Sequence, residues 1–148
     1  MPLTLYKQSD PKWGGLFISP GVTMAESGCY ITSLAMIDGR TPEQVLYNLK
    51  QWGAFDNNGL MYSGKAAEAL GFIYSKIERD KKGNLSIPNK ICIAETNHFA
   101  NKGIPQHFFV WLDENTTSDS IPLIADPIDG KIKTNPYNLV SFRVFERV

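Results

Sequence analysis

Residues 27–37 have the sequence Ser-Gly-Cys-Tyr-Ile-Thr-Ser-Leu-Ala-Met-Ile, and the rest of the chain is organised around them. The apolar run after Cys29 predicts a buried helix that begins at the cysteine and ends at Asp38, with Gly39 as the stop. A thiol at a helix N-terminus faces the positive end of the helix dipole, which favours the thiolate. Gly28 allows close backbone approach and leaves the sulfur uncovered. A cysteine in an apolar helix is more often a small core residue, so Cys29 needs chemical partners before it is interpreted as a nucleophile.

Length and charge restrict the class of protein. The 148 residues predict one domain, 1–148, that is long enough to bury a core. Fifteen basic and fifteen acidic side chains cancel, so neither a nucleic acid nor an anionic membrane is indicated as a partner. No apolar run is long enough to span a membrane, and no signal peptide is recognisable at the N-terminus. We therefore expect a cytoplasmic location, or release by a route that needs no signal peptide.

Two cysteines, Cys29 and Cys92, are too few for a disulfide scaffold and form no metal-ligand pattern. A disulfide between them remains open at this stage. The run Asp56-Asn57-Asn58-Gly59 has the composition of a calcium loop, but the bidentate glutamate at the required spacing is absent, which favours a plain turn. The sequence therefore predicts no metal and no cofactor.

The N-terminal half is predicted to be helical after a short strand over residues 3–8 and a loop that continues to Ser27. A second helix begins where Thr41 is the N-cap, Pro42 takes the first helical position and Gln44 completes a capping box. A third helix is expected over residues 61–70, closed by Gly71.

The period of the apolar residues changes from helical to strand-like after Gly71. Strands are expected over residues 72–77, 90–94, 107–112, 121–125 and 139–145. A polar loop over 113–120 and a turn at Asp129-Gly130 separate the later strands. Helices followed by strands with short connections predict an α+β fold with an antiparallel sheet.

A cysteine nucleophile needs a base, an acceptor that orients the base, and donors for the oxyanion. His107 at the start of one strand and Asp126 at the end of the next can meet Cys29 at one end of a sheet. Gln8 ends the first segment and supplies a side-chain amide. Each residue also has an ordinary interpretation: His107 as a structural histidine, Asp126 before Pro127 as a turn starter, and Gln8 as a surface residue.

The remaining cysteine and histidine are weaker candidates. Cys92 lies between isoleucines in a predicted strand, which favours burial over reactivity. His98 lies in a predicted loop, with no strand to hold its ring. Taken together, the order Gln, Gly-Cys, His, Asp in a helix-then-sheet chain favours the catalytic interpretation.

The chain resembles papain-like cysteine peptidases, and more narrowly the group similar to the peptidase domains that process double-glycine bacteriocin leaders. The resemblance rests on residues 6–13 (Tyr-Lys-Gln-Ser-Asp-Pro-Lys-Trp), Gly28-Cys29 with residues 32–36, Thr41-Pro42, residues 107–110 and Asp126-Pro127. It implies N-terminal helices packed on a C-terminal antiparallel sheet. It also implies that Cys29 is the nucleophile, His107 the base and acid, Asp126 the orienting group and Gln8, with the Cys29 N–H, the oxyanion hole.

Two features depart from that pattern. Pro105-Gln106 precedes His107 where such families often carry glycine or another small residue, which alters the expected substrate channel. No ATP-binding or membrane region is present, so the resemblance is to stand-alone members, which occur as lytic or processing modules in phages and bacteria.

The favoured hypothesis is hydrolysis of a peptide or other amide bond by a thiol peptidase or amidase. One alternative makes the substrate a peptidoglycan stem peptide, cleaved by a lytic endopeptidase or amidase. Another is a catalytically inactive papain-like module that binds a peptide or protein. Candidates for the walls of a substrate cleft are Trp13, Trp52, Trp111 and Tyr62.

Overall fold

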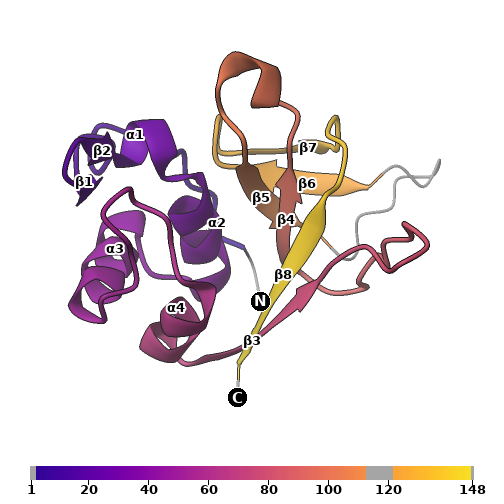
Figure 1. Cartoon of the computed structure of the whole chain (residues 1–148). Coiled ribbons are helices and arrows are strands. Elements are labelled where there is room, and N and C mark those ends of the chain that lie inside the picture. The colour runs from indigo at the N-terminus through magenta and orange to yellow at the C-terminus, as the bar shows by residue number, and fades with distance from the viewer. Residues whose placement is uncertain (1–2, 113–121, 148) are drawn as a thin grey trace.

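The computed structural model of the chain describes residues 3–112 and 122–147, and divides them into a helical half and a sheet half (Figure 1). The helical half begins with two short strands and contains four helices: β1 (Phe17–Ser19), β2 (Val22–Thr23), α1 (Met24–Ser27), α2 (Cys29–Asp38), α3 (Pro42–Gln51) and α4 (Ser63–Leu70). The sheet half contains β3 (Phe72–Ile77), β4 (Cys92–Thr96), the 3₁₀ turn η1 (Ala100–Lys102), β5 (His107–Trp111), β6 (Leu123–Asp126), β7 (Lys131–Thr134) and β8 (Ser141–Arg147). The predicted order of helices followed by strands is confirmed.

Helix α2 begins at Cys29 and ends at Asp38, as predicted. Gly39 closes it in the left-handed conformation, at φ 95°, which glycine adopts without steric cost. The capping box of α3 is also confirmed, because the Thr41 hydroxyl accepts the Gln44 N–H and the Gln44 amide oxygen accepts the Thr41 N–H. The start of the third helix was predicted two residues too early, because α4 begins at Ser63.

The first segment differs from the sequence prediction. Residues 3–8 form no strand. The Gln8 N–H donates to the Pro127 carbonyl at 2.8 Å, and Leu3 and Tyr6 pack against a small core cluster that includes Val110 of β5 and Ala125 of β6. The segment predicted as loop up to Ser27 instead contains the β1–β2 hairpin and the one-turn helix α1. Both are too short to produce a recognisable period in the sequence.

The six longer strands form one antiparallel sheet in the order β3-β8-β4-β5-β6-β7. Strand β3 lies where it was predicted, whereas β4 and β8 begin two residues later than predicted. Strand β7 follows the predicted Asp129-Gly130 turn but was missed, since only Ile132 is apolar among its four residues. The predicted loop over 113–120 lies outside the described residues.

The core lies on both faces of the sheet. One cluster joins the helices to the sheet and includes Leu34, Leu49, Ile93 and Phe108, while a second, with Phe109 and Trp111, packs on the opposite face. Figure 1 shows α2 between the other helices and the sheet, with its closest packing against β5. Across residues 3–112 and 122–147, no helix has the length and hydropathy needed to cross a membrane.

Candidate active site

Two elements bring the cysteine and the histidine together. Cys29 is the first residue of α2 and is half-buried, and His107 is the first residue of β5, on which α2 packs. The side chains of Cys29 and His107 lie close enough for Cys29 to raise the pKa of His107. Because the first N–H groups of a helix have no acceptor within the helix, the Cys29 N–H is directed out of α2 beside its own sulfur.

The imidazole of His107 is held by Asp126. Its Nε2 lies 2.9 Å from Asp126 Oδ1, and both side chains are buried. A carboxylate accepts only, so Nε2 carries a proton and Nδ1 is left for Cys29. The structure therefore brings Cys29, His107 and Asp126 together, although Cys29 and His107 are 78 positions apart in the sequence.

Asp126 has three further partners. Its Oδ2 accepts a hydrogen bond from the Tyr137 hydroxyl and lies 3.2 Å from Lys133 Nζ, and its Oδ1 accepts the Ile128 N–H at 3.1 Å. Burial raises the pKa of Asp126, but the hydrogen bonds from His107 and Tyr137 outweigh it and hold the pKa well below the ordinary value. Tyr137 and Lys133 were not predicted from the sequence, since neither belongs to a motif; their shared polarity near the Asp129-Gly130 turn was the only available signal.

The same contacts raise the pKa of His107 to about 9, from an ordinary value of 6.5. Burial lowers this pKa, and the hydrogen bonds with Asp126 and Cys29 raise it by more. The raised pKa favours the protonated imidazolium form of His107 at neutral pH.

Gln8 is fixed to both halves of the molecule. Its Nε2 donates to the Ala25 carbonyl at 3.0 Å, and its backbone N–H donates to Pro127. Because a carbonyl only accepts, the amide must present its NH₂ group to Ala25, which leaves the second N–H of Nε2 uncommitted to that bond. The segment before it is anchored by Trp13, whose indole N–H donates to the Lys7 carbonyl at 2.8 Å.

Gln8, Cys29 and His107 line one cleft of about 620 Å³. Its apolar walls come from the α2 start, the α3–α4 connection and the β4–β5 connection, and they include Tyr30, Phe55, Leu60, Met61, Phe99, Ile104 and Phe108. The cleft-wall predictions from the sequence were wrong for all four residues. Trp13 and Trp111 are buried in the core, and Trp52 and Tyr62 are exposed outside the cleft.

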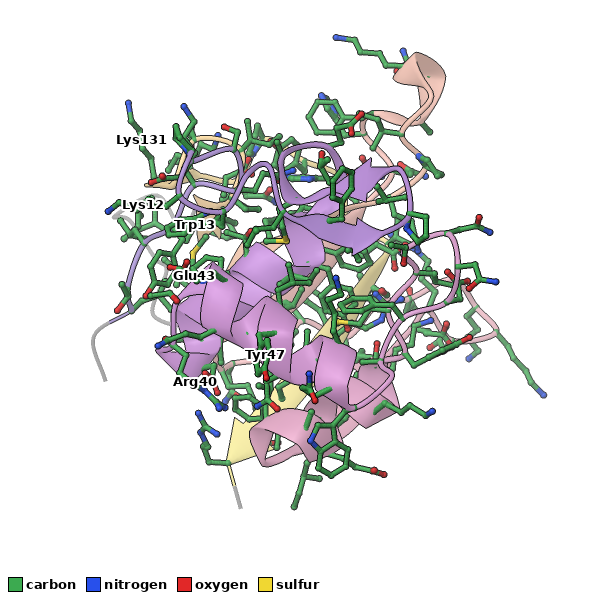
Figure 2. The ribbon with its side chains drawn as sticks, turned by 90° about the vertical axis from the view of Figure 1, so that its left-hand side faces the viewer. Lys12, Trp13, Arg40, Glu43, Tyr47 and Lys131 are labelled. Carbon is green, nitrogen blue, oxygen red and sulfur yellow. The ribbon has the colours of Figure 1, made fainter. Side chains whose placement is uncertain are left out.

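A second cavity, of about 770 Å³, lies on the outer side of the helical half. Figure 2 shows Arg40, Glu43 and Tyr47 on this face, and Leu16 and Phe17 are also among the lining residues. Although it is larger than the cleft, it contains no cysteine or histidine among the described residues that line it. We therefore take the smaller cleft as the candidate active site.

The other candidates stay outside the cleft. Cys92 is fully buried on β4, and His98 lies in the β4–β5 connection with its ring against Phe99 and Tyr137. The two cysteines, both among the described residues, do not form a disulfide. Asp56 accepts the N–H groups of Asn58 and Leu60, as in a plain turn, and no metal-ligand cluster occurs within residues 3–112 and 122–147.

A comparison with protein-family models gives no match to this chain, and a comparison with curated proteins gives no significant match.

Proposed function

We propose that the protein is a cysteine peptidase or amidase of the papain-like kind, similar to the double-glycine leader peptidases, and that it cleaves an amide bond in the cleft beside Cys29. The observation that carries the proposal is the series Cys29–His107–Asp126 where α2 and β5 begin, with Gln8 lining the same cleft. A core cysteine would need neither a charged histidine beside it nor a buried carboxylate behind that histidine.

The chemistry follows from the charges. The Cys29 thiolate attacks the carbonyl carbon of the substrate, and the resulting oxyanion accepts hydrogen bonds from the Cys29 N–H and the Gln8 amide. The His107 imidazolium gives its proton to the leaving amine, and a thioester remains on Cys29. Water then attacks the thioester, His107 takes up the proton, and the acid product leaves the regenerated thiolate. Asp126 holds the ring throughout and is not itself protonated.

The buried side chain of Gln8 gives an independent reason to assign it to the oxyanion hole. Its Oε1 is buried and has no hydrogen-bond partner within the described part of the chain. An unsatisfied buried acceptor costs about 1–3 kcal/mol, so a purely structural side chain at this position would favour an apolar residue. An oxyanion donor requires the amide whatever the cost to stability.

The test uses Cys29→Ala with the purified protein. We expect turnover of labelled casein or of purified cell walls to be lost, while the circular dichroism spectrum and melting temperature remain close to those of the unchanged protein, because Cys29 is half-buried. Iodoacetamide followed by peptide mass mapping should modify Cys29 at neutral pH. Activity that survives in Cys29→Ala would overturn the proposal, and a Cys29 that iodoacetamide leaves unmodified would favour a peptide-binding module without catalysis.

The two substrates separate the two enzymatic possibilities. Release of peptides from casein supports a protein or leader peptidase, and release of stem peptides from cell walls supports a lytic endopeptidase or amidase. The neutral net charge and the apolar cleft walls favour an ordinary peptide, because stem peptides carry several free carboxylates.

A further inference from the structure

The side chain of Gln106 lies at the edge of the candidate active site. Gln106 directly precedes His107, is half-buried and lines the cleft. Its Nε2 lies 2.8 Å from Oε2 of Glu95, a buried residue of β4 that pairs with Phe108 on β5. The side-chain amide of Gln106 is therefore anchored to the sheet through Glu95.

Glu95 is itself fixed by two residues of β8. The Ser141 hydroxyl donates to Glu95 Oε1 at 2.6 Å, and Arg143 Nη2 donates to the same oxygen at 3.2 Å. Glu95, Ser141 and Arg143 are all buried, so the carboxylate and the guanidinium are each other's counterion. The guanidinium also lies over the Phe108 ring, 4.9 Å from its centre, which limits its movement.

A carboxylate paired with a guanidinium only accepts hydrogen bonds. The Gln106 amide must consequently turn its NH₂ group towards Glu95, and its carbonyl oxygen away from it. No described residue donates to that oxygen, which is not among the fully buried polar atoms. The buried pair thus fixes which end of the amide is left to face a bound molecule.

We propose that Gln106 is a substrate-binding residue whose Oε1 accepts a backbone N–H of the bound peptide, and that Glu95 is a positioning residue that sets this orientation. The inference rests on the proposed function, because the substrate is a peptide only if the cleft is that of a peptidase. Among the described residues that line the cleft, Glu26 is the one carboxylate and there is no lysine or arginine. Apart from Glu26 and His107, the polar side chains of the cleft are therefore neutral, and Gln106 is the one that directly precedes His107 in the sequence.

The test measures how fast two kinds of reagent alkylate Cys29. Acetyl-Ala-Ala chloromethyl ketone needs the peptide site, whereas iodoacetamide reports the reactivity of the thiol alone. Two further ketones carry an ester in place of one or the other amide, so that each lacks a single N–H. In the unchanged protein, one of the esters should react about tenfold more slowly than the amide, the effect of one hydrogen bond.

In Gln106→Leu, the amide and that ester should react at the same, slower rate, and the iodoacetamide rate should stay as it was. Glu95→Gln should reduce the amide-to-ester ratio as well, because a glutamine at residue 95 can accept or donate and no longer dictates the orientation of Gln106.

Gln51→Leu, at an exposed glutamine at the end of α3, is the matched control and should keep the tenfold ratio. Should Glu95→Gln fail to fold, Gln106→Leu still decides, since its side chain is only half-buried.

A tenfold ratio that persists in Gln106→Leu would overturn the inference, as would two esters that both react as fast as the amide in the unchanged protein. Either result leaves the peptidase proposal standing, provided that iodoacetamide modifies Cys29. Absence of any reaction at Cys29 with iodoacetamide or the ketones would instead overturn the proposed function and this inference together.

Discussion

Asp126 has more polar partners than any other residue described at the candidate site. It binds His107, Tyr137, Lys133 and the Ile128 N–H. We expect Asp126→Asn to lower kcat on casein about 10- to 1000-fold, because an amide orients His107 less well and does not stabilise its charge. The loss should be smaller than in Cys29→Ala, which has no nucleophile. Equal losses in the two variants would contradict a role of Asp126 in orientation alone.

The raised pKa of His107 predicts the pH profile of activity. We expect the alkaline limb of kcat/KM to have its midpoint at about pH 9, because the imidazolium that protonates the leaving amine is lost there. Asp126→Asn removes a hydrogen bond that raises this pKa, so the limb should move to lower pH. Measurement of kcat/KM from pH 5 to 10.5 tests this prediction. An alkaline limb with its midpoint near pH 6.5 in the unchanged protein would contradict it.

The free energy of unfolding should also depend on whether His107 is protonated. Because the pKa of His107 is higher in the folded protein than the ordinary 6.5, protonation stabilises the fold fully below about pH 6.5, and this contribution is lost as the pH rises through about 9. Urea unfolding at pH 6 and pH 9.5 should show the folded protein to be less stable at the higher pH. His107→Gln serves as the comparison and should show a smaller difference between the two pH values.

The candidate site residues were easier to predict from the sequence than the residues that hold Asp126 in place. Cys29 and His107 stand at the boundary of strongly patterned elements, and such boundaries are visible in the sequence. Gln8 was correctly placed near them, although the strand expected to carry it does not exist. Tyr137 and Lys133 could not be predicted, because they reach Asp126 through the antiparallel pairing of β6 and β7 and the connection after it, and no local pattern encodes that pairing.

At the scale of elements, Gly28 joins α1 to α2. Its backbone angles are ordinary, with φ −87°, but a Cβ there would lie 2.5 Å from the Met24 carbonyl oxygen. We expect Gly28→Ala to displace α1, and with it the Ala25 carbonyl that holds Gln8. The free energy of unfolding should fall by about 1–3 kcal/mol, and kcat should fall with it. Calorimetry and kinetics on the same sample provide the check.

Gly64→Ala is the matched control for Gly28→Ala. Gly64 lies in α4, and a Cβ there meets nothing within 4 Å. Alanine favours the helix, so this variant should be up to about 1 kcal/mol more stable, with unchanged activity. Destabilisation of both variants by a similar amount would show that the close contact with Met24 is not the cause.

The accuracy of the element predictions followed the length and pattern of each element. Helix α2 begins and ends at the predicted residues, and the predicted capping box marks the start of α3 correctly. The hairpin β1–β2, α1 and β7 have two to four residues each, too few for a period to appear, and they were missed. The strand expected over residues 3–8 alternates correctly, but it pairs with none of the described strands, so tertiary context overrides the pattern.

At the scale of the whole molecule, Arg147 ties the last strand to two helices. Its guanidinium donates to the Leu70 carbonyl at the end of α4, and to both the carboxylate and the carbonyl oxygen of Asp38 at the end of α2. It also lies 4.1 Å from the centre of the Phe72 ring. Arg147 therefore links the helical and sheet halves at the C-terminal end of α2, whereas the cleft lies at its N-terminal end.

We expect Arg147→Met to lower the free energy of unfolding by about 1–2 kcal/mol, because three hydrogen bonds are lost but the side chain is half-exposed. Activity per folded molecule should stay within about twofold of the unchanged protein. Lys102→Met, at an exposed lysine of η1, is the control and should leave stability as it is. An unfolding free energy that does not change in Arg147→Met would contradict the fastening role.

The distance along the chain between Cys29 and Asp126 has a consequence for biosynthesis. About 100 residues must be translated after Cys29 before Asp126 exists, which takes about 5–20 s on a ribosome. During that interval the thiol has neither its charged histidine nor the cleft wall from the sheet half. Under the proposed function, a newly made chain therefore lacks the complete candidate site until the C-terminal strands pack against α2.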